Sequence, residues 1–240
     1  MRVLLPPVGM DEEFWQASGL LGEGHAAVVY PGHGSRATAR PWPGLEQLAD
    51  EVAELFADTA DSGGADLIGV SLGGMIAQHV ALRHPAVVRS LVLVSTTART
   101  DRDLMLDRAS RSGEDAWPGV VEETLARWFT AELLAAQPEH PGVLCVRRSL
   151  ARVDPDAWAG AWRAMAYQDV LEELRAVQVP VSCVAGSEDR SAPLAALAAI
   201  AERVPRSRLL VMDAAHVAPV ERPDEFRALI EDHERWVAAG

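Results

Sequence analysis

Six short runs of residues along the chain are almost entirely apolar. They do not alternate apolar with polar positions, and unbroken runs of this kind are typical of strands buried on both faces of a parallel sheet. The runs cover residues 2–5, 26–30, 65–70, 90–95, 179–186 and 207–212. Each is therefore predicted to form a strand.

Helical patterns separate the apolar runs. Residues 45–59, 73–83 and 192–203 have helical periods, and a last helix begins at Pro223 with its apolar residues on one face. Strand–helix alternation predicts an α/β fold with right-handed crossovers. We expect a doubly wound, mostly parallel sheet of about six strands.

One long segment, residues 98–177, interrupts this alternation. It has no strand-like run and several helical ones, which carry Trp117, Trp128, Trp158 and Trp162. We expect a helical lid inserted after the fourth strand, over the carboxyl ends of the strands where open α/β sheets place their sites. Residues 1–97 and 178–240 would then form the core.

The charge balance narrows the partners that the chain can bind. A net charge of -13 argues against nucleic acid and against an anionic membrane surface. All 22 cationic side chains are arginine, so a lysine Schiff base, lysine-anchored pyridoxal phosphate and a P-loop are excluded.

The sequence contains few features that indicate the cellular compartment. The opening residues MRVLLPPVGM reach two prolines too soon for a signal peptide, and no segment approaches membrane-spanning length. The two cysteines, Cys145 and Cys183, lie far apart and are interpreted as buried or inert thiols. A soluble, cytoplasmic protein is expected.

The most informative motif lies where the third apolar run meets a helix. Residues 69–73 are Gly-Val-Ser-Leu-Gly, the G-x-S-x-G pattern of a nucleophile elbow. In such a turn the backbone is strained and lifts the hydroxyl of Ser71 clear of the sheet, while the helix N-terminus offers N–H groups to an oxyanion. A chance match in a glycine-rich loop is the alternative, but the flanking strand and helix favour a nucleophile.

A serine nucleophile needs a base, and the base needs an orienting carboxylate. Of the seven histidines, His216 is the best candidate because it follows the last predicted strand at its carboxyl end. Asp189 follows the preceding strand in the same way, with Glu188 and Asp213 as alternatives. We therefore expect Ser71, His216 and Asp189 to form a catalytic triad.

Several stretches of the chain resemble a known family. GVSLGGMIAQHVALRHPAVVRSLVLVSTTA is similar to the 3-oxoadipate enol-lactonase branch of the α/β-hydrolases, and so are ARWFTAEL, RVDPDAWAGAWRAM, VPVSCVAGSEDRSAP and AAHVAPVERPDEF. The chain order Ser71, Asp189, His216 is also that of the family. The resemblance implies hydrolysis of an ester or lactone through an acyl-enzyme on Ser71, without metal or cofactor.

The resemblance also suggests further site residues. It implies that the N–H groups of Leu72 and Val8 form the oxyanion hole, although Pro6-Pro7 stands where relatives have His-Gly. Proline cannot donate but Val8 can, so we expect a hole of altered shape. Arg127 and Trp128 match a family position that faces the pocket, where they would receive an acidic lactone; the alternative is a solvated charge and a core aromatic residue.

Relatives begin with extra strands before the one that corresponds to residues 2–5. Residues 26–30 should consequently form an apolar sheet edge, which is an aggregation hazard unless it is covered. We expect a second subunit to pair with it about a twofold axis, with a covering loop as the alternative.

Two functions other than an ester or lactone hydrolase stay open from the sequence: a carbon–carbon bond hydrolase on the same triad, and a binding protein with weakened catalysis.

Overall fold

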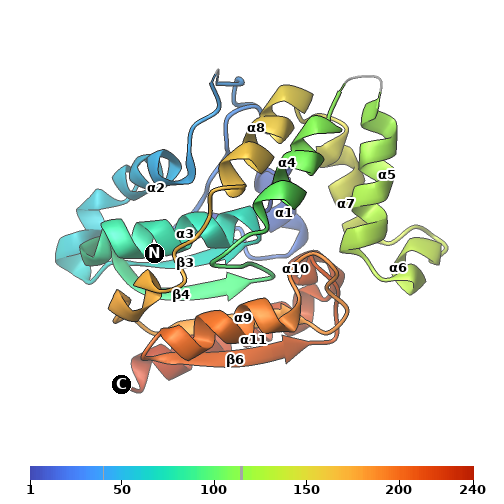
Figure 1. Cartoon of the computed structure of the whole chain (residues 1–240). Coiled ribbons are helices and arrows are strands. Elements are labelled where there is room, and N and C mark those ends of the chain that lie inside the picture. Colours follow the sequence, from blue (N-terminus) through green and yellow to red (C-terminus); the bar gives the residue numbers. More distant parts are fainter. Residues whose placement is uncertain (40, 114–115) are drawn as a thin grey trace.

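The computed structural model describes residues 1–39, 41–113 and 116–240. Its centre is a six-stranded parallel sheet with the strand order β2-β1-β3-β4-β5-β6 (Figure 1). The strands are β1 (Arg2–Leu5), β2 (His25–Ala27), β3 (Ala65–Val70), β4 (Val88–Val94), β5 (Val181–Gly186) and β6 (Ser207–Met212). The predicted α/β fold with about six strands is confirmed.

Every position of β3 and β5 is buried, so the central strands are covered on both faces. The α-helices outside the β4–β5 connection are α1 (Glu12–Ala17), α2 (Leu45–Glu54), α3 (Leu72–Arg83), α9 (Leu194–Arg203), α10 (Ala218–Glu221) and α11 (Pro223–Ala238). α3 packs on β1, β3 and β4, whereas α9 packs on β5 and β6. α2 ends earlier than the predicted residue 59, because Phe56 leaves the helical backbone and is completely buried; the 3₁₀ helix η1 (Ala57–Ser62) follows.

A helical segment joins β4 to β5. It contains α4 (Arg102–Ser110), α5 (Trp117–Trp128), α6 (Ala131–Ala135), α7 (Pro141–Leu150), α8 (Pro155–Met165) and the 3₁₀ helix η4 (Glu173–Ala176). Figure 1 shows α4, α5, α7 and α8 near the carboxyl ends of the strands. The ring of Trp158 packs against the rings of the other three tryptophans, with centroid separations of 5.6 to 6.4 Å. Treating residues 98–177 as a separate lid stays a prediction.

The outer strands differ from the predicted fully buried ones. All three residues of β2 are half-buried, and on β6 Leu209 and Val211 are 39% and 55% exposed. Both strands lie at an edge of the sheet, where the covering helices end. β2 occupies the edge predicted for residues 26–30 but ends at Ala27. Tyr30, the last residue of the predicted strand, is buried, and its hydroxyl donates a hydrogen bond to the carbonyl oxygen of Pro6 (3.2 Å).

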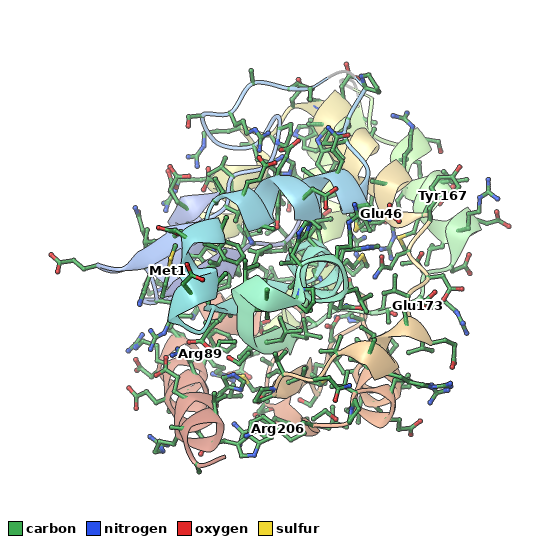
Figure 2. All side chains as sticks on the ribbon, turned by 90° about the vertical axis from the view of Figure 1, so that its left-hand side faces the viewer. Met1, Glu46, Arg89, Tyr167, Glu173 and Arg206 are labelled. Atoms are coloured by element: carbon green, nitrogen blue, oxygen red, sulfur yellow. The ribbon has the colours of Figure 1, made fainter. Side chains whose placement is uncertain are left out.

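A buried polar chain holds α11 against the sheet. His233 Nδ1 lies 2.7 Å from Ser182 Oγ, and its Nε2 lies 3.0 Å from Ser90 Oγ. Ser90 donates to Asp66, which also pairs with Arg89 at the end of the sheet that faces the viewer in Figure 2. Burial lowers the pKa of His233 to about 4, so this histidine is a neutral core residue.

Both cysteines are buried free thiols, as predicted. Burial raises the pKa of Cys145 to about 11 and that of Cys183 to about 12, so neither is a thiolate near neutral pH. Across the described ranges, no helix combines the length and apolar character that crossing a bilayer requires.

Candidate active site

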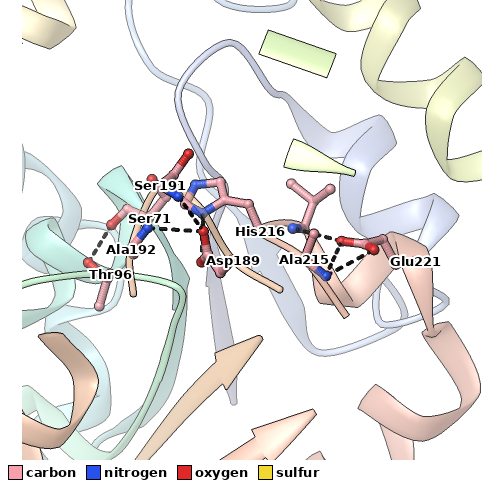
Figure 3. A network of polar contacts seen from close by, with 9 residues as sticks. Ser71, Thr96, Asp189, Ser191, Ala192, Ala215, His216 and Glu221 are labelled. Atoms are coloured by element: carbon pink, nitrogen blue, oxygen red, sulfur yellow. Dashed lines mark hydrogen bonds and ion pairs between the residues drawn. The ribbon is translucent and has the colours of Figure 1, made fainter. Parts of the chain in front are cut away.

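Ser71 lies in the sharp turn between β3 and α3. Its φ and ψ are 53° and -114°, a strained conformation for a residue with a Cβ. Two hydrogen bonds hold this backbone: the Ser71 N–H donates to the carbonyl oxygen of Val94 (2.9 Å), and Thr96 Oγ1 donates to the Ser71 carbonyl oxygen (2.7 Å; Figure 3). The predicted elbow conformation is therefore present.

The two glycines of the motif have a steric role. A Cβ on Gly69 would overlap the carbonyl group of Gly73, and a Cβ on Gly73 would overlap the carbonyl oxygen of Leu5. The first turn of α3 can approach β3 and β1 so closely only because these side chains are absent. The same approach brings the start of α3 next to the turn that follows β1.

His216 lies in the loop after β6 and is 2% exposed. Its own N–H donates to the carbonyl oxygen of Trp128 (3.0 Å), and the two rings pack with their centroids 5.3 Å apart. The end of α5, on which Trp128 lies, thus fixes one side of the histidine.

Asp189, which follows β5, holds the other side of His216. Nδ1 of the imidazole lies 3.0 and 2.9 Å from the two carboxylate oxygens, and the carboxylate also accepts from the N–H groups of Ser191 (2.7 Å) and Ala192 (3.0 Å). Burial alone would raise the pKa of Asp189, but His216 and these N–H donors outweigh burial and lower it. Asp189 is therefore ionised at neutral pH and fixes the imidazole tautomer.

The alternative acids are not placed for this role. Glu188 and Asp213 are exposed, and Asp213 accepts a hydrogen bond from Ser187 Oγ (3.3 Å). Of the three carboxylates considered from the sequence, Asp189 is the one that contacts His216.

Ser71 and His216 line one cavity of about 40 Å³ between the sheet and the helical segment. Trp128, Trp162 and Arg108 are part of its wall. Arg108 and Trp162 also line an adjoining cavity of about 20 Å³.

Arg127 faces this adjoining cavity together with Arg108. Glu123 lies 3.6 Å from Arg127, and Nε of Arg127 is buried with no hydrogen-bond partner among the described residues. Burial, with repulsion by Arg108 as the second cause, lowers the pKa of Arg127 to about 10, and burial also lowers the pKa of Arg108. The neighbouring carboxylates Glu123 and Asp107 are both exposed, so the two partly desolvated cations favour an anionic group between them.

Four more polar atoms at the Ser71 cavity are buried without a partner in the described part of the chain. They are Ser95 Oγ, Ser191 Oγ, Trp128 Nε1 and Trp162 Nε1. Each carries a hydrogen that it can donate, so the cavity suits a ligand with several acceptor oxygens.

The two expected oxyanion donors lie on either side of the elbow. Val8 is buried in the turn after β1, and Leu72 is the first residue of α3. Neither N–H donates to a backbone acceptor among residues 1–39, 41–113 and 116–240. Both remain predicted donors, because helix N-terminal and turn N–H groups are free for an oxyanion.

Sequence reasoning missed Arg108, Ser95 and Glu221. Arg108 is one of many arginines in a helical stretch, and Ser95 directly follows β4 with a φ of 48° that no local pattern predicts. Glu221 is buried beside His216 although its sequence neighbourhood suggests an ordinary helical glutamate. Folding of distant segments onto one another brings Arg108 and Ser95 to the cavity, whereas Glu221 reaches the backbone beside His216 because α10 turns back on the loop that precedes it.

Two curated relatives cover most of the chain. A 3-oxoadipate enol-lactonase from Acinetobacter baylyi is 27% identical over 201 residues, which span 83% of this chain and 74% of the relative. A pimeloyl-[acyl-carrier protein] methyl ester esterase from Chromobacterium violaceum is 32% identical over 213 residues, covering 85% and 81%.

A solved structure has the same fold. The enol-lactonase from Burkholderia xenovorans aligns with a TM-score of 0.86 and 25% identity, over 98% of this chain and 90% of its own. Residues 3–229 match the alpha/beta hydrolase family. The resemblance found in the sequence is confirmed, and the chain belongs to the alpha/beta hydrolase family.

Proposed function

We propose that this protein is a serine hydrolase that cleaves a small carboxylic ester or lactone through an acyl-enzyme on Ser71. The observation that carries the proposal is the buried Asp189–His216 pair, whose histidine lines one cavity with a serine on a strained elbow. The relatives named as an enol-lactonase and a methyl ester esterase support the same chemistry.

Ser71 Oγ attacks the carbonyl carbon while His216 accepts the hydroxyl proton. The N–H groups of Val8 and Leu72 donate to the oxyanion that forms. Collapse of the tetrahedral intermediate breaks the carbonyl–oxygen bond, and His216 protonates the departing oxygen. A water molecule, deprotonated by His216, then attacks the acyl carbon, and the acid product leaves Ser71 with its proton restored.

Two features bear on the alternatives. A binding protein would not need a carboxylate paired with an imidazole beside a strained serine, so this arrangement favours catalysis. A carbon–carbon bond hydrolase would use the same residues, and a screen of small lactones, p-nitrophenyl esters and diketones separates the two reactions. If Pro6-Pro7 displaces Val8, the loss of one oxyanion donor would cost about 2.7–4 kcal/mol of transition-state stabilisation.

We propose that the substrate carries a carboxylate and that residues 98–177 act as the lid that receives it. Arg108 and Arg127 are partly buried cations beside the Ser71 cavity, and Trp128 forms its wall. A carboxylate between the two guanidinium groups would relieve their repulsion and satisfy Nε of Arg127. Monoesters and lactones of dicarboxylic acids have this chemistry.

Replacing Ser71 with alanine removes the nucleophile, so ester hydrolysis and labelling by a fluorophosphonate probe should both be lost. The residual rate should come from binding and the oxyanion hole alone. p-Nitrophenyl ester turnover and mass spectrometry of the labelled protein measure the two effects, with circular dichroism to confirm folding. Unchanged turnover in Ser71→Ala would contradict the proposal.

Replacing Asp189 with asparagine should leave the fold intact and slow acylation by several orders of magnitude, on the order of 10⁴-fold in the reference case of a serine protease. The reason is that His216 loses its orienting carboxylate and its preferred tautomer. Glu188→Gln and Asp213→Asn are matched controls on exposed carboxylates and should be nearly neutral. If Asp189→Asn left the acylation rate unchanged while one of the controls lowered it severely, the residue changed in that control would be the carboxylate that orients His216.

Arg108→Gln should raise the KM for the p-nitrophenyl monoester of a dicarboxylic acid by roughly tenfold or more, because a charge-assisted hydrogen bond contributes about 1.5–3 kcal/mol. The KM for an uncharged p-nitrophenyl ester should stay within about twofold, since no carboxylate is bound. Arg102→Gln, an exposed arginine on the same helix, is the control and should change neither value. An equal rise in KM for both esters would contradict the proposal that Arg108 binds the carboxylate of the substrate.

We also propose that two copies pair through the edge strand β2. An apolar groove of about 380 Å³ lies beside this strand, lined by Val29, Val52 and Leu55, and Leu55 is 62% exposed. Light scattering should give twice the chain mass of 25.8 kDa, and Leu55→Glu should shift the protein to monomer. A monomer of the unaltered protein at micromolar concentration would rule the dimer out.

A further inference from the structure

Glu221 is a buried carboxylate that contacts the backbone on both sides of His216. Both of its oxygens accept a hydrogen bond from the Ala215 N–H (3.1 Å each), and Oε1 also accepts from the Val217 N–H (3.2 Å; Figure 3). The residue is 2% exposed and forms the end of the short helix α10. It does not touch the cavity at Ser71.

Three consecutive N–H groups in this loop therefore have fixed acceptors. Those of Ala215 and Val217 donate to Glu221, and that of His216 donates to the carbonyl oxygen of Trp128. All three residues are buried, so an N–H that lost its acceptor would be left without water to replace it. The position of the imidazole depends on this backbone, since its side chain has only two rotatable bonds beyond it.

An ion pair does not explain why the carboxylate is buried. The neighbouring Arg222 donates from Nε to the carbonyl oxygen of Asp213 (3.2 Å), and the hydrogen bonds described for Glu221 all come from backbone N–H groups. Burial raises the pKa of Glu221 to about 7, even though the N–H groups of Ala215 and Val217 favour the ionised form. Because such burial is costly, the carboxylate must supply something that a neutral side chain does not.

What the Glu221 carboxylate supplies is the capacity to accept hydrogen bonds with both of its oxygens. A glutamine of the same size would turn an NH₂ group toward one of the N–H donors, and a protonated carboxyl would present an O–H. Oε1 could still accept from both N–H groups, but either change would place a donor where Oε2 now accepts from the Ala215 N–H. The clamp, meaning the hydrogen bonds from the Ala215 and Val217 N–H groups to Glu221, is therefore strongest with the ionised glutamate.

We propose that Glu221 is a positioning residue, which acts through His216 by fixing the backbone of residues 215–217. The inference rests on the proposed function, because it assigns a purpose to holding His216. With the loop fixed, Nδ1 of His216 stays on Asp189 while Nε2 stays directed at the Ser71 cavity. Loosening the clamp should lower the rate of acylation and leave substrate affinity unchanged.

Several charged groups act on the Glu221 carboxylate. Arg222 stabilises its ionised form, and Asp189 opposes it. The elements packed against α10 are α1, α7 and α11, and the titratable or charged residues at their starts are Glu12, Glu13, His140, Asp224 and Glu225. Burial lowers the pKa of His140, whereas it raises that of Glu221 to about 7. A pH response of the Ala215 and Val217 amides that is lost in Glu221→Gln is therefore assigned to Glu221 and not to the nearby His216.

The main experiment compares Glu221→Gln with the unaltered protein. We expect kcat for a p-nitrophenyl ester and the rate of fluorophosphonate labelling to fall on the order of a hundredfold, because a small misplacement of a catalytic group has an effect of this size. KM should stay within about twofold. Glu225→Gln, on an exposed carboxylate of α11, is the matched control and should change neither constant.

A rise in KM with unchanged kcat, or equal labelling of both proteins, would overturn the inference. If Glu221→Gln does not fold, Glu221→Asp keeps the charge but shortens the reach, and the same fall in kcat is expected. If the unaltered protein neither hydrolyses esters nor labels, the proposed function fails, and the clamp is still tested by a measurement that needs no catalysis.

That measurement is the amide nitrogen chemical shift of Ala215 and Val217 in the unaltered protein. Both amides should titrate together with a midpoint near pH 7, because both donate to the same carboxylate. Deprotonation of Glu221 should move both resonances in the direction of stronger hydrogen bonding. Amides that stay constant across this range, or that titrate with different midpoints, would show that Glu221 does not hold the loop.

Discussion

The close contact between the first turn of α3 and the ends of β3 and β1 is the constraint on which the rest of the site depends. Glycine at positions 69 and 73 allows this contact, because a Cβ at either position would overlap backbone carbonyl groups. The contact forces Ser71 into a positive φ, and hydrogen bonds to Val94 and from Thr96 maintain that strain. The register of the sheet determines which residues lie beside the elbow: Leu5 of β1 pairs with Gly69, and Val94 of β4 pairs with Val70.

The histidine is held by contacts from several directions rather than by one partner. Asp189 contacts Nδ1, Trp128 accepts from the backbone N–H, and Glu221 accepts from the N–H groups on either side. These contacts come from the loop after β5, the end of α5 and the end of α10. Because each of them is buried, water cannot replace an acceptor that is lost, and the loop has one favourable conformation.

The two sides of the site have opposite charge. Buried carboxylates, Asp189 and Glu221, lie behind His216, whereas the helical segment contributes Arg108 and Arg127 on the side of the cavity. The carboxylates are neutralised by N–H donors and the imidazole, but the arginines lack comparable acceptors among the described residues. In a protein with a net charge of -13, Arg108 and Arg127 thus place partly buried positive charge beside the Ser71 cavity, with the exposed Glu123 as the ion-pair partner of Arg127.

The sequence by itself determined which segments form the strands, where the elbow lies and in which order the candidate triad follows. Unbroken apolar runs and the G-x-S-x-G pattern are local properties, so they can be recognised without a structure. The ends of elements could not be predicted in the same way: α2 ends before Phe56, whose side chain is completely buried, and β2 ends at Ala27 although the apolar run continues to the buried Tyr30. Such endings depend on what a side chain contacts after folding.

Only the tertiary structure decided what surrounds the triad. Nothing in the sequence distinguishes Arg108 from the exposed Arg102 of the same helix, or Glu221 from the exposed Glu225, because residues of one type look alike until their environments differ. Folding brings Arg108 to Arg127 and turns Glu221 toward the backbone N–H groups beside His216. Those backbone donors are present in every residue except proline, so the sequence carries no sign of which of them a buried carboxylate will contact.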